Sequence, residues 1–238
     1  MEIIRYRCHS DMDIEFLDNY HYIKNRTTYS NFINGQIKNP FDKSVYNIGY
    51  IGDGIHACRL DKDGMTQEYE SWLLMLRRCY SERNKNKYPA YFGICFVNQD
   101  WHNFQNFAEW YKENRYDVNE RLHLDKDILN PGNKEYSSKK CLLVPQRINE
   151  LFTYKRNNDG LPMGVRKTST GRYSTGYNGK NIGTFNTLKE AFSMYKVHKE
   201  SAIKEVATEY KNIIPSKLYD SLLNYEVIIE NDINFRVS

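Results

Sequence analysis

Two carboxylates separated by one residue, Asp125 and Asp127, are the side chains of this chain best suited to binding a metal ion. They lie in the stretch 122–152, which reads LHLDKDILNPGNKEYSSKKCLLVPQRINELF. Carboxylate oxygens are ligands that Mg²⁺ and similar ions prefer, and such an ion can stabilise the charge that develops on a phosphate under attack. The pattern therefore indicates metal-assisted phosphoryl chemistry, and the elements that position these carboxylates decide whether it is feasible.

The carboxylates require a rigid element to hold them. Residues 124–129 alternate in polarity as a short strand does, which predicts Asp125 and Asp127 on one face. Lys126 would then lie on the opposite face, because successive side chains of a strand alternate.

A turn, a second strand and a helix are predicted to follow. Asn-Pro-Gly-Asn at 130–133 is a strong turn signal. The apolar run 141–144 can pair back on the first strand before Pro145 ends it. A helix beginning at Gln146 would carry Asn149 one turn in. The predicted order is therefore strand, loop, strand, helix, with polar side chains from strand and helix on one site.

This order, with GNK.YS..C.(V)P..IN after an acidic strand, resembles the ββα-metal core of HNH endonucleases, especially homing-type proteins of phages and mobile elements. The resemblance implies a DNA-cleaving enzyme with one divalent ion, Mg²⁺ or Mn²⁺. It places Asp125 at the metal-ligand position and Asn149 at the helix ligand, with Asp127 as a further ligand. Lys126 occupies the position at which the family has a general-base histidine.

The lysine is a departure from the family pattern. A lysine is protonated at neutral pH unless strongly desolvated, so Lys126 is better suited to stabilising phosphate charge than to abstracting a proton. Two readings stay open: either Asp127 or the nearby His123 supplies the base in a variant site, or the core has lost catalysis and serves as a DNA-binding scaffold. A third reading is a plain acidic turn between two core strands.

Composition sets the broad class. The 238 residues are 40% hydrophobic and 27% charged, which is typical of an ordered globular protein. The sequence has no apolar run of the length that a membrane span needs, and its first residues lack the apolar core of a signal peptide, so we expect no membrane association and a cytoplasmic location in a bacterial host cell. Five scattered cysteines without a C-x-x-C pair argue against a disulfide framework or a zinc knuckle.

The net charge of +4 is concentrated in one segment. Residues 153–212 contain 11 Lys and Arg against 5 Asp and Glu, whereas residues 213–238 contain 2 against 4. The first 152 residues are therefore neutral. A basic segment attached to a neutral body is typical of a polyanion-binding module.

That basic segment is predicted to form a three-stranded sheet and a helix. The strands fall at 163–167, 172–177 and 181–185, and Thr187 with Glu190 forms a capping box that begins a long amphipathic helix. GVRK, GRYST, NIGTF and T.KEAF..Y resemble the ethylene-response-factor (APETALA-type) DNA-binding domain. The resemblance implies that the exposed sheet face enters the major groove of double-stranded DNA. The implied contacts come from Arg166, Lys167, Arg172, Tyr173, Tyr177 and Lys180.

The remaining segments complete an α+β fold. Four short β-prone runs, the last at 44–52, predict a small N-terminal β domain at 1–60. Two helices precede the ββα core in a domain at 61–152: one near 66–80 with Thr66 as its N-cap, and one near 100–111 that follows a brief strand at 92–97. Arg77 and Arg78 lie near the C-terminus of the first helix, where the helix dipole favours cations, and phosphate contact is the alternative. A sheet-and-helix domain at 153–212 and a helix-then-strand tail at 213–238, packing back on the body, would follow.

The sequence therefore predicts a metal-dependent, DNA-binding endonuclease. The alternative is a catalytically inactive, sequence-specific DNA-binding regulator derived from such an enzyme. An inhibitor that binds a host protein through the N-terminal domain, and a homodimer, both stay open.

Overall fold

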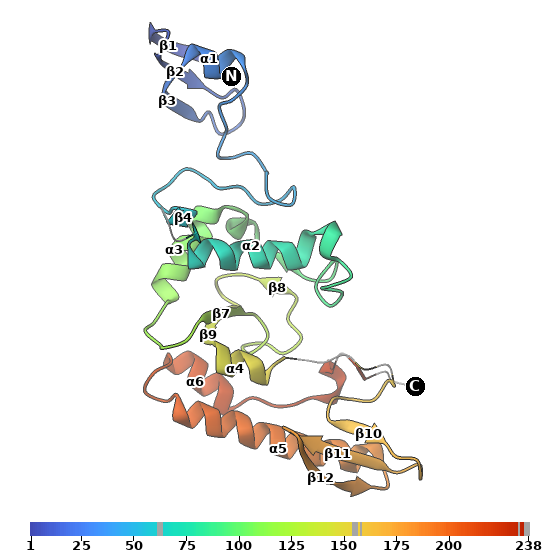
Figure 1. Cartoon of the computed structure of the whole chain (residues 1–238). Helices are drawn as coiled ribbons and strands as arrows, with labels where there is room; N and C mark the ends of the chain where they lie inside the picture. Colours follow the sequence, from blue (N-terminus) through green and yellow to red (C-terminus); the bar gives the residue numbers. More distant parts are fainter. Residues whose placement is uncertain (61–63, 154–156, 158, 233, 236–238) are drawn as a thin grey trace.

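The computed structural model describes residues 1–60, 64–153, 157, 159–232 and 234–235, and these form a mixed α+β protein (Figure 1). The sequence favours a turn at 61–65 and a polar, basic linker at 153–160, and residues 61–63, 154–156 and 158 of these segments lie outside the described ranges. Figure 1 shows an N-terminal sheet, a central body and a C-terminal sheet with a long helix. No helix in the described ranges is both long and apolar enough to cross a membrane.

The N-terminal part is an antiparallel sheet in the order β1 (Glu2–Cys8), β2 (Asp11–Glu15), β3 (Ile23–Thr27), followed by the short helix α1 (Tyr29–Ile33). Its fully buried side chains are Met12 and Ile14. The predicted fourth strand near 44–52 is wrong. Tyr46 and Asn47 have positive φ, so the chain makes a tight turn there that is closed by a bridge between Val45 and Gly49.

The central body packs two helices against each other. Thr66 caps α2 (Gln67–Tyr80), as predicted, and Asn103 caps α3 (Phe104–Asn114). The predicted helix at 100–111 is broken, because a 3₁₀ turn (Gln99–His102) ends at that Asn103 cap. Buried aromatic side chains form the core between the two helices: Trp72, Trp101, Phe104, Phe107 and Tyr111.

Small strands complete the body. The pair β4 (Arg59–Leu60) and β5 (Gly64–Met65) is antiparallel, and the pair β6 (Phe96–Val97) and β8 (Glu135–Tyr136) is parallel. The predicted strand at 92–97 is thus reduced to its last two residues.

The ββα unit forms with a corrected first strand. Strand β7 (Leu122–Asp125) pairs antiparallel with β9 (Leu142–Pro145), and α4 (Gln146–Leu151) follows directly. The predicted strand at 124–129 is wrong beyond Asp125. There the Asp125 side chain accepts the backbone N–H groups of Asp127 and Ile128, and this turns the chain away from the sheet.

The C-terminal sheet has the order β10 (Val165–Lys167), β11 (Tyr173–Tyr177), β12 (Lys180–Phe185), all antiparallel. Asn178 and Gly179 both have positive φ, as the two-residue turn between β11 and β12 requires. Helix α5 (Leu188–Glu209) begins with the predicted capping box.

Helix α6 (Ser216–Leu223) ends the regular structure together with a 3₁₀ turn (Ile229–Asn231), so the strand predicted after this helix does not form.

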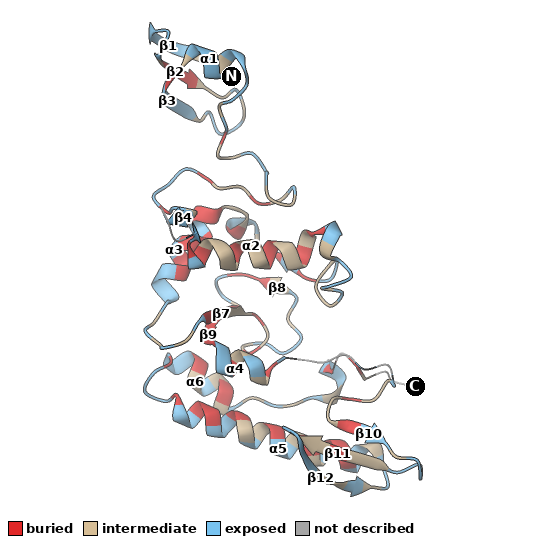
Figure 2. Ribbon diagram, in the orientation of Figure 1, coloured by how far each residue is buried: buried red, intermediate tan, exposed pale blue. Residues whose placement is uncertain are grey.

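Helix α5 serves two hydrophobic cores (Figure 2). Its first half packs Ala191, Phe192 and Tyr195 against the C-terminal sheet. Its second half packs on the ββα unit and on α6 through a second hydrophobic cluster, here called the joint core. The joint core contains residues from both sides of the predicted domain boundary between residues 152 and 153. It includes Ile128, Val144, Ile148, Phe152, Ile203, Val206, Ala207, Tyr210, Leu218 and Leu222. At 22 residues, α5 spans about 33 Å. One rigid element therefore connects the ββα unit to the C-terminal sheet.

Candidate functional site

Asp125 ends strand β7, and one of its oxygens is already committed. Oδ1 accepts hydrogen bonds from the backbone N–H groups of Asp127 at 2.9 Å and Ile128 at 2.7 Å. The residue keeps some solvent exposure, but the protein surrounds the carboxylate closely, and this desolvation raises the pKa of Asp125 to about 6. The turn thus fixes the carboxylate in one orientation at the end of the strand.

Lys126 and Asp127 form a closed pair beside it. Lys126 Nζ donates to both Asp127 oxygens, at 2.7 and 2.9 Å, and to the backbone oxygen of Asn133 at 2.6 Å. A lysine ammonium has three N–H donors, and these three contacts use them all. The rings of Tyr91 and Tyr136 lie 5.5 and 5.9 Å from the same nitrogen. Lys126 therefore ties the loop 126–133 together.

The electrostatics keep Lys126 charged. Burial lowers the pKa of Lys126, but the adjacent Asp127 carboxylate outweighs burial and leaves the pKa raised. Burial also raises the pKa of Asp127, and the contact with Lys126 opposes that rise. A protonated amine cannot accept a proton from water, so this geometry favours a structural role for Lys126.

Substitution of Lys126 by methionine is expected to destabilise the protein by about 2 kcal/mol. The change leaves Asp127, whose side chain is 36% exposed, without its counterion in a partly desolvated place. Urea unfolding of the full chain measures the loss. The double variant Lys126→Met/Asp127→Leu should recover much of it, because no unpaired charge is left behind. Equal losses in the single and double variants would contradict the assigned role of the pair.

His123 lies two residues before Asp125, on the same face of β7. Its Nε2 is buried and has no hydrogen-bond partner among the described residues. Burial lowers the pKa of His123, and the nearby cations Arg121 and Arg78 lower it further. The imidazole is therefore neutral at physiological pH, which is the form that can accept a proton.

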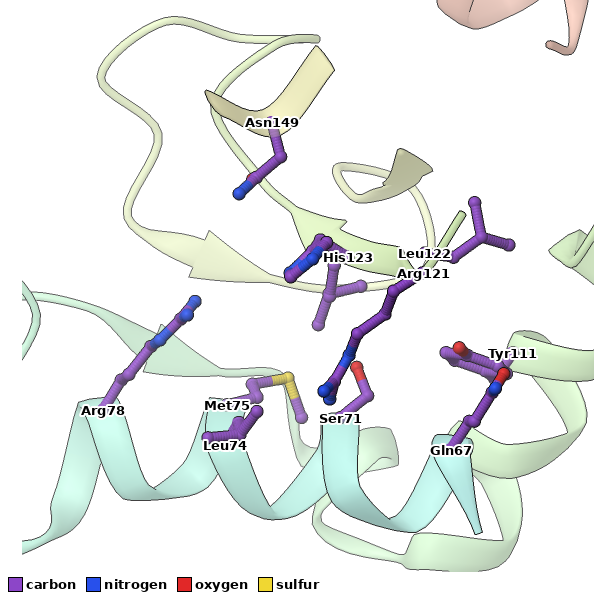
Figure 3. Close-up of a pocket in the computed structure, with 11 residues that line it drawn as sticks. Gln67, Ser71, Leu74, Met75, Arg78, Tyr111, Arg121, Leu122, His123 and Asn149 are labelled. Atoms are coloured by element: carbon purple, nitrogen blue, oxygen red, sulfur yellow. The ribbon is translucent and has the colours of Figure 1, made fainter. Parts of the chain in front are cut away.

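Polar side chains from two helices border the same space as this imidazole. Asn149 of α4 and Arg78 of α2 line the same small cavity of about 40 Å³ as His123 (Figure 3). In Figure 3 the Arg78 guanidinium and the Asn149 amide both extend into the space beside the histidine ring. Asn149 and Arg78 also line a larger neighbouring cavity of about 610 Å³, together with Asp125. Four polar residues from three elements therefore border two adjoining spaces.

Arg78 is available for an anion. No ion pair between described residues includes it; its guanidinium is hydrogen-bonded to the Tyr136 side chain and lies 5.6 Å from the centre of the Tyr91 ring. Burial opposes its charge, but the surrounding tyrosines Tyr136 and Tyr91 leave its pKa raised. Sequence reasoning favoured a helix-dipole role here. The sequence also held a sign of phosphate contact, the alternative role: Leu74 and Met75, one helical turn before Arg78, offer its guanidinium no acidic partner.

The residues fit a metal ion only in part. Within the described ranges, no cluster of three or more His, Cys, Asp or Glu side chains could hold an ion. Mg²⁺, however, is commonly held by one or two carboxylates, with substrate phosphate and water completing its shell. Asp125 and Asn149, which border one cavity, fit that mode. Asp127 would have to leave Lys126 to take part, so its role as a ligand stays a prediction.

The C-terminal sheet presents a polar open face. Arg166 pairs with Ser174, which pairs with Thr184, so these three form one row across the sheet. The alternating row, Lys167 with Tyr173 and Phe185, lies on the face that α5 covers. Arg172 precedes β11, is exposed, and donates from Nη2 to the Thr184 backbone oxygen at 3.0 Å. Arg166 and Arg172 are thus the basic side chains of the open face.

Three of the other predicted DNA contacts are placed differently from expectation. Tyr173 and Tyr177 belong to the core beneath the sheet, and the Tyr177 ring packs 5.9 Å from that of Tyr195. Lys167 is exposed but shares the helix-covered row. Lys180 is exposed as the first residue of β12, directly after the turn, where a phosphate could reach it. The alternation of side chains along each strand shows which residues share a face, but it does not show which face the helix covers.

Comparison with known proteins gives no family assignment: no family model matches this chain, and neither a curated protein nor a solved structure matches it. The geometry of the site and of the open sheet face is therefore the basis for the functional conclusion.

Proposed function

We propose that this chain is a metal-dependent DNA endonuclease. The observation that carries the proposal is the convergence of His123 and Asp125 from β7, Asn149 from α4 and Arg78 from α2 on two adjoining cavities. Together they offer a neutral base, a carboxylate, an amide oxygen and a cation that has no carboxylate partner in the described part of the chain, the set that phosphodiester hydrolysis needs.

Each side chain has a distinct part in the reaction. His123 Nε2 takes a proton from water as the water oxygen bonds to phosphorus; the bond to the leaving sugar oxygen breaks, and that oxygen takes a proton from solvent. Arg78 binds a non-bridging phosphate oxygen and stabilises the negative charge that grows there. Asp125 and Asn149 would hold one Mg²⁺ or Mn²⁺ ion, which supplies charge stabilisation at the same phosphate. Lys126 and Asp127 keep the adjacent loop in place.

Duplex DNA is the proposed substrate because of the C-terminal sheet. Its segment carries the basic excess of the chain, and Arg166 and Arg172 project from its open face. Helix α5 connects this sheet to the ββα unit through the joint core. A duplex held by the sheet would therefore stay in a fixed relation to the site.

Incubation of purified full-length protein with supercoiled plasmid tests the proposal. Nicked or linear product is expected with Mg²⁺ or Mn²⁺ and should disappear when EDTA is added. A folded protein that leaves supercoiled plasmid, linear duplex and single-stranded DNA intact with both metals would exclude the proposal.

A second candidate is a sequence-specific DNA-binding regulator without nuclease activity. The locked Lys126–Asp127 pair at the family's base position favours it. DNA binding that needs no metal, together with a biological effect that survives Asp125→Asn, would support this candidate over the nuclease.

Substitution of Arg166 by alanine in the full-length protein is expected to weaken specific DNA binding by about 2 kcal/mol. A guanidinium reading a guanine edge contributes about this much, and its loss should relax preference at one base pair. Fluorescence anisotropy across salt concentrations provides the measurement.

Lys180→Ala should weaken the binding of all DNA sequences alike, and should lower the slope of log affinity against log salt concentration by about one. Lys217→Ala, an exposed lysine on α6, is the charge-matched control and should change neither. An unchanged affinity in Arg166→Ala would exclude the open face as the reading surface.

A further inference from the structure

The larger cavity extends beyond the residues that the proposed chemistry uses. It measures about 610 Å³ and shares Arg78, Asp125 and Asn149 with the candidate site. The remaining wall is mainly aromatic, apolar or amide-bearing; it includes Tyr88, Tyr91, Ile94, Phe152, Tyr225, Asn86, Asn133 and Asn231. None of these side chains has a part in the proposed hydrolysis, so the hydrolysis does not account for this part of the cavity.

The lining suits a ligand that is both flat and anionic. Four cations line the cavity, namely Arg78, Lys87, Lys126 and Lys134, against two carboxylates, Asp125 and Asp127. Since Lys126 and Asp127 neutralise each other, the excess positive charge belongs to Arg78, Lys87 and Lys134, offset by Asp125. Rings, amides and cations in one space are the groups that contact a nucleotide's base and phosphate.

Among the aromatic walls, Tyr88 is the best placed for stacking. Two cations, Arg78 and Lys126, lie over the Tyr91 ring, at 5.6 and 5.5 Å, whereas a single cation, Lys87, lies over the Tyr88 ring. Phe152 and Tyr225 pack edge to face on each other at 4.8 Å. Tyr88 is half-buried in the segment 86–91 that lines the cavity, and its backbone oxygen accepts a hydrogen bond from the backbone N–H of Tyr91 at 2.9 Å, which fixes this segment. The side chain of Lys87 lies 5.6 Å from the Tyr88 ring, so a cation accompanies that ring.

We infer that this cavity binds one unstacked nucleotide of the DNA strand next to the phosphate at the candidate site, with its base against Tyr88 and its phosphate toward Arg78 and Lys87. The inference rests on the proposed function, because the shared residues place the nucleotide beside the cleaved bond. Taking a base out of the stack costs a few kcal/mol, and less when the base is unpaired. The protein should therefore prefer DNA with an unpaired base at that position.

Binding of 2-aminopurine duplexes to full-length Asp125→Asn tests this without requiring cleavage. One duplex carries the reporter base paired, and a second carries it opposite an abasic site. We expect about tenfold tighter binding of the second, with reporter fluorescence quenched on binding. Tyr88→Phe should keep the preference, Tyr88→Leu should abolish it, and Tyr6→Leu, an exposed tyrosine of the N-terminal sheet, is the matched control. Circular dichroism confirms that each variant is folded.

The outcomes separate this inference from the nuclease proposal. Plasmid cleavage by the wild type together with equal binding of both duplexes would overturn the nucleotide cavity alone. A preference that persists in folded Tyr88→Leu would overturn it too. A clear preference without any cleavage would keep the cavity and remove the nuclease. Competition by millimolar deoxynucleoside monophosphate that removes the preference entirely would assign the cavity to a free nucleotide, and would overturn the strand assignment.

Discussion

Asp125→Asn is expected to lower the rate of Mg²⁺-dependent plasmid nicking by about 10³-fold, equivalent to about 4 kcal/mol of transition-state stabilisation. The fold should survive, because the asparagine Oδ1 can still accept the two backbone N–H groups that Asp125 accepts. The carboxylate charge is lost and with it the strongest ligand of the proposed ion. Single-turnover nicking at saturating protein measures the chemical step.

Three companion variants assign the roles around Asp125. His123→Ala should lower the rate about 10²-fold through loss of the base. Arg78→Leu should reduce the rate too, through loss of phosphate binding. Lys126→Met/Asp127→Leu should retain most activity, because this pair is structural in the proposed site. Wild-type rates in Asp125→Asn, or cleavage that continues in EDTA, would contradict the assignment of the site.

Ile203→Ala is expected to destabilise the protein by about 4 kcal/mol. Ile203 is 0% exposed and lies in the joint core, where α5 meets the ββα unit and α6. Removing this much buried apolar side chain costs transfer free energy and leaves a cavity. Val197→Ala on the same helix, where valine is 58% exposed, is the control and should change stability by less than about 0.5 kcal/mol.

The same variant tests whether α5 couples the two parts. Ion pairing at the rim, from Arg147 to Glu209 at 2.5 Å, adds to the joint core. Because one helix serves both cores, the ββα unit and the C-terminal sheet should lose stability together. Hydrogen exchange should show faster opening in β9 and in β11 of the Ile203→Ala protein. Faster exchange in only one of them would mean that the two parts unfold independently.

Features set by neighbouring residues were predictable from the sequence. The Thr66 cap, the Thr187 and Glu190 capping box, and the Asn178-Gly179 turn depend on groups within four residues of each other, and all are present. The pairing of 141–144 with an acidic strand was also predictable from apolar runs on either side of a turn. The sequence by itself therefore determined the order of the main helices and strands and the C-terminal sheet.

Other features depend on contacts between distant segments, which periodicity does not encode. Strand β7 ends at Asp125 because the Asp125 side chain accepts a backbone N–H group, and Lys126 donates in the same way to the backbone oxygen of Asn133. These hydrogen bonds outweigh the strand propensity of the residues that follow. The partial burial of Tyr173 beneath the sheet was decided by where α5 lies, not by the alternation of the strand.

The candidate site shows the same division. Sequence spacing placed His123 and Asp125 on one strand, and the order of elements placed Asn149 on the helix after it. Only the tertiary structure brought Arg78, more than forty residues earlier, to the same cavity, and only it joined α5 to the ββα unit. The physical reason is that burial and the loss of solvent are collective properties of packed elements, so the charge state and availability of each polar side chain are set after the chain has folded.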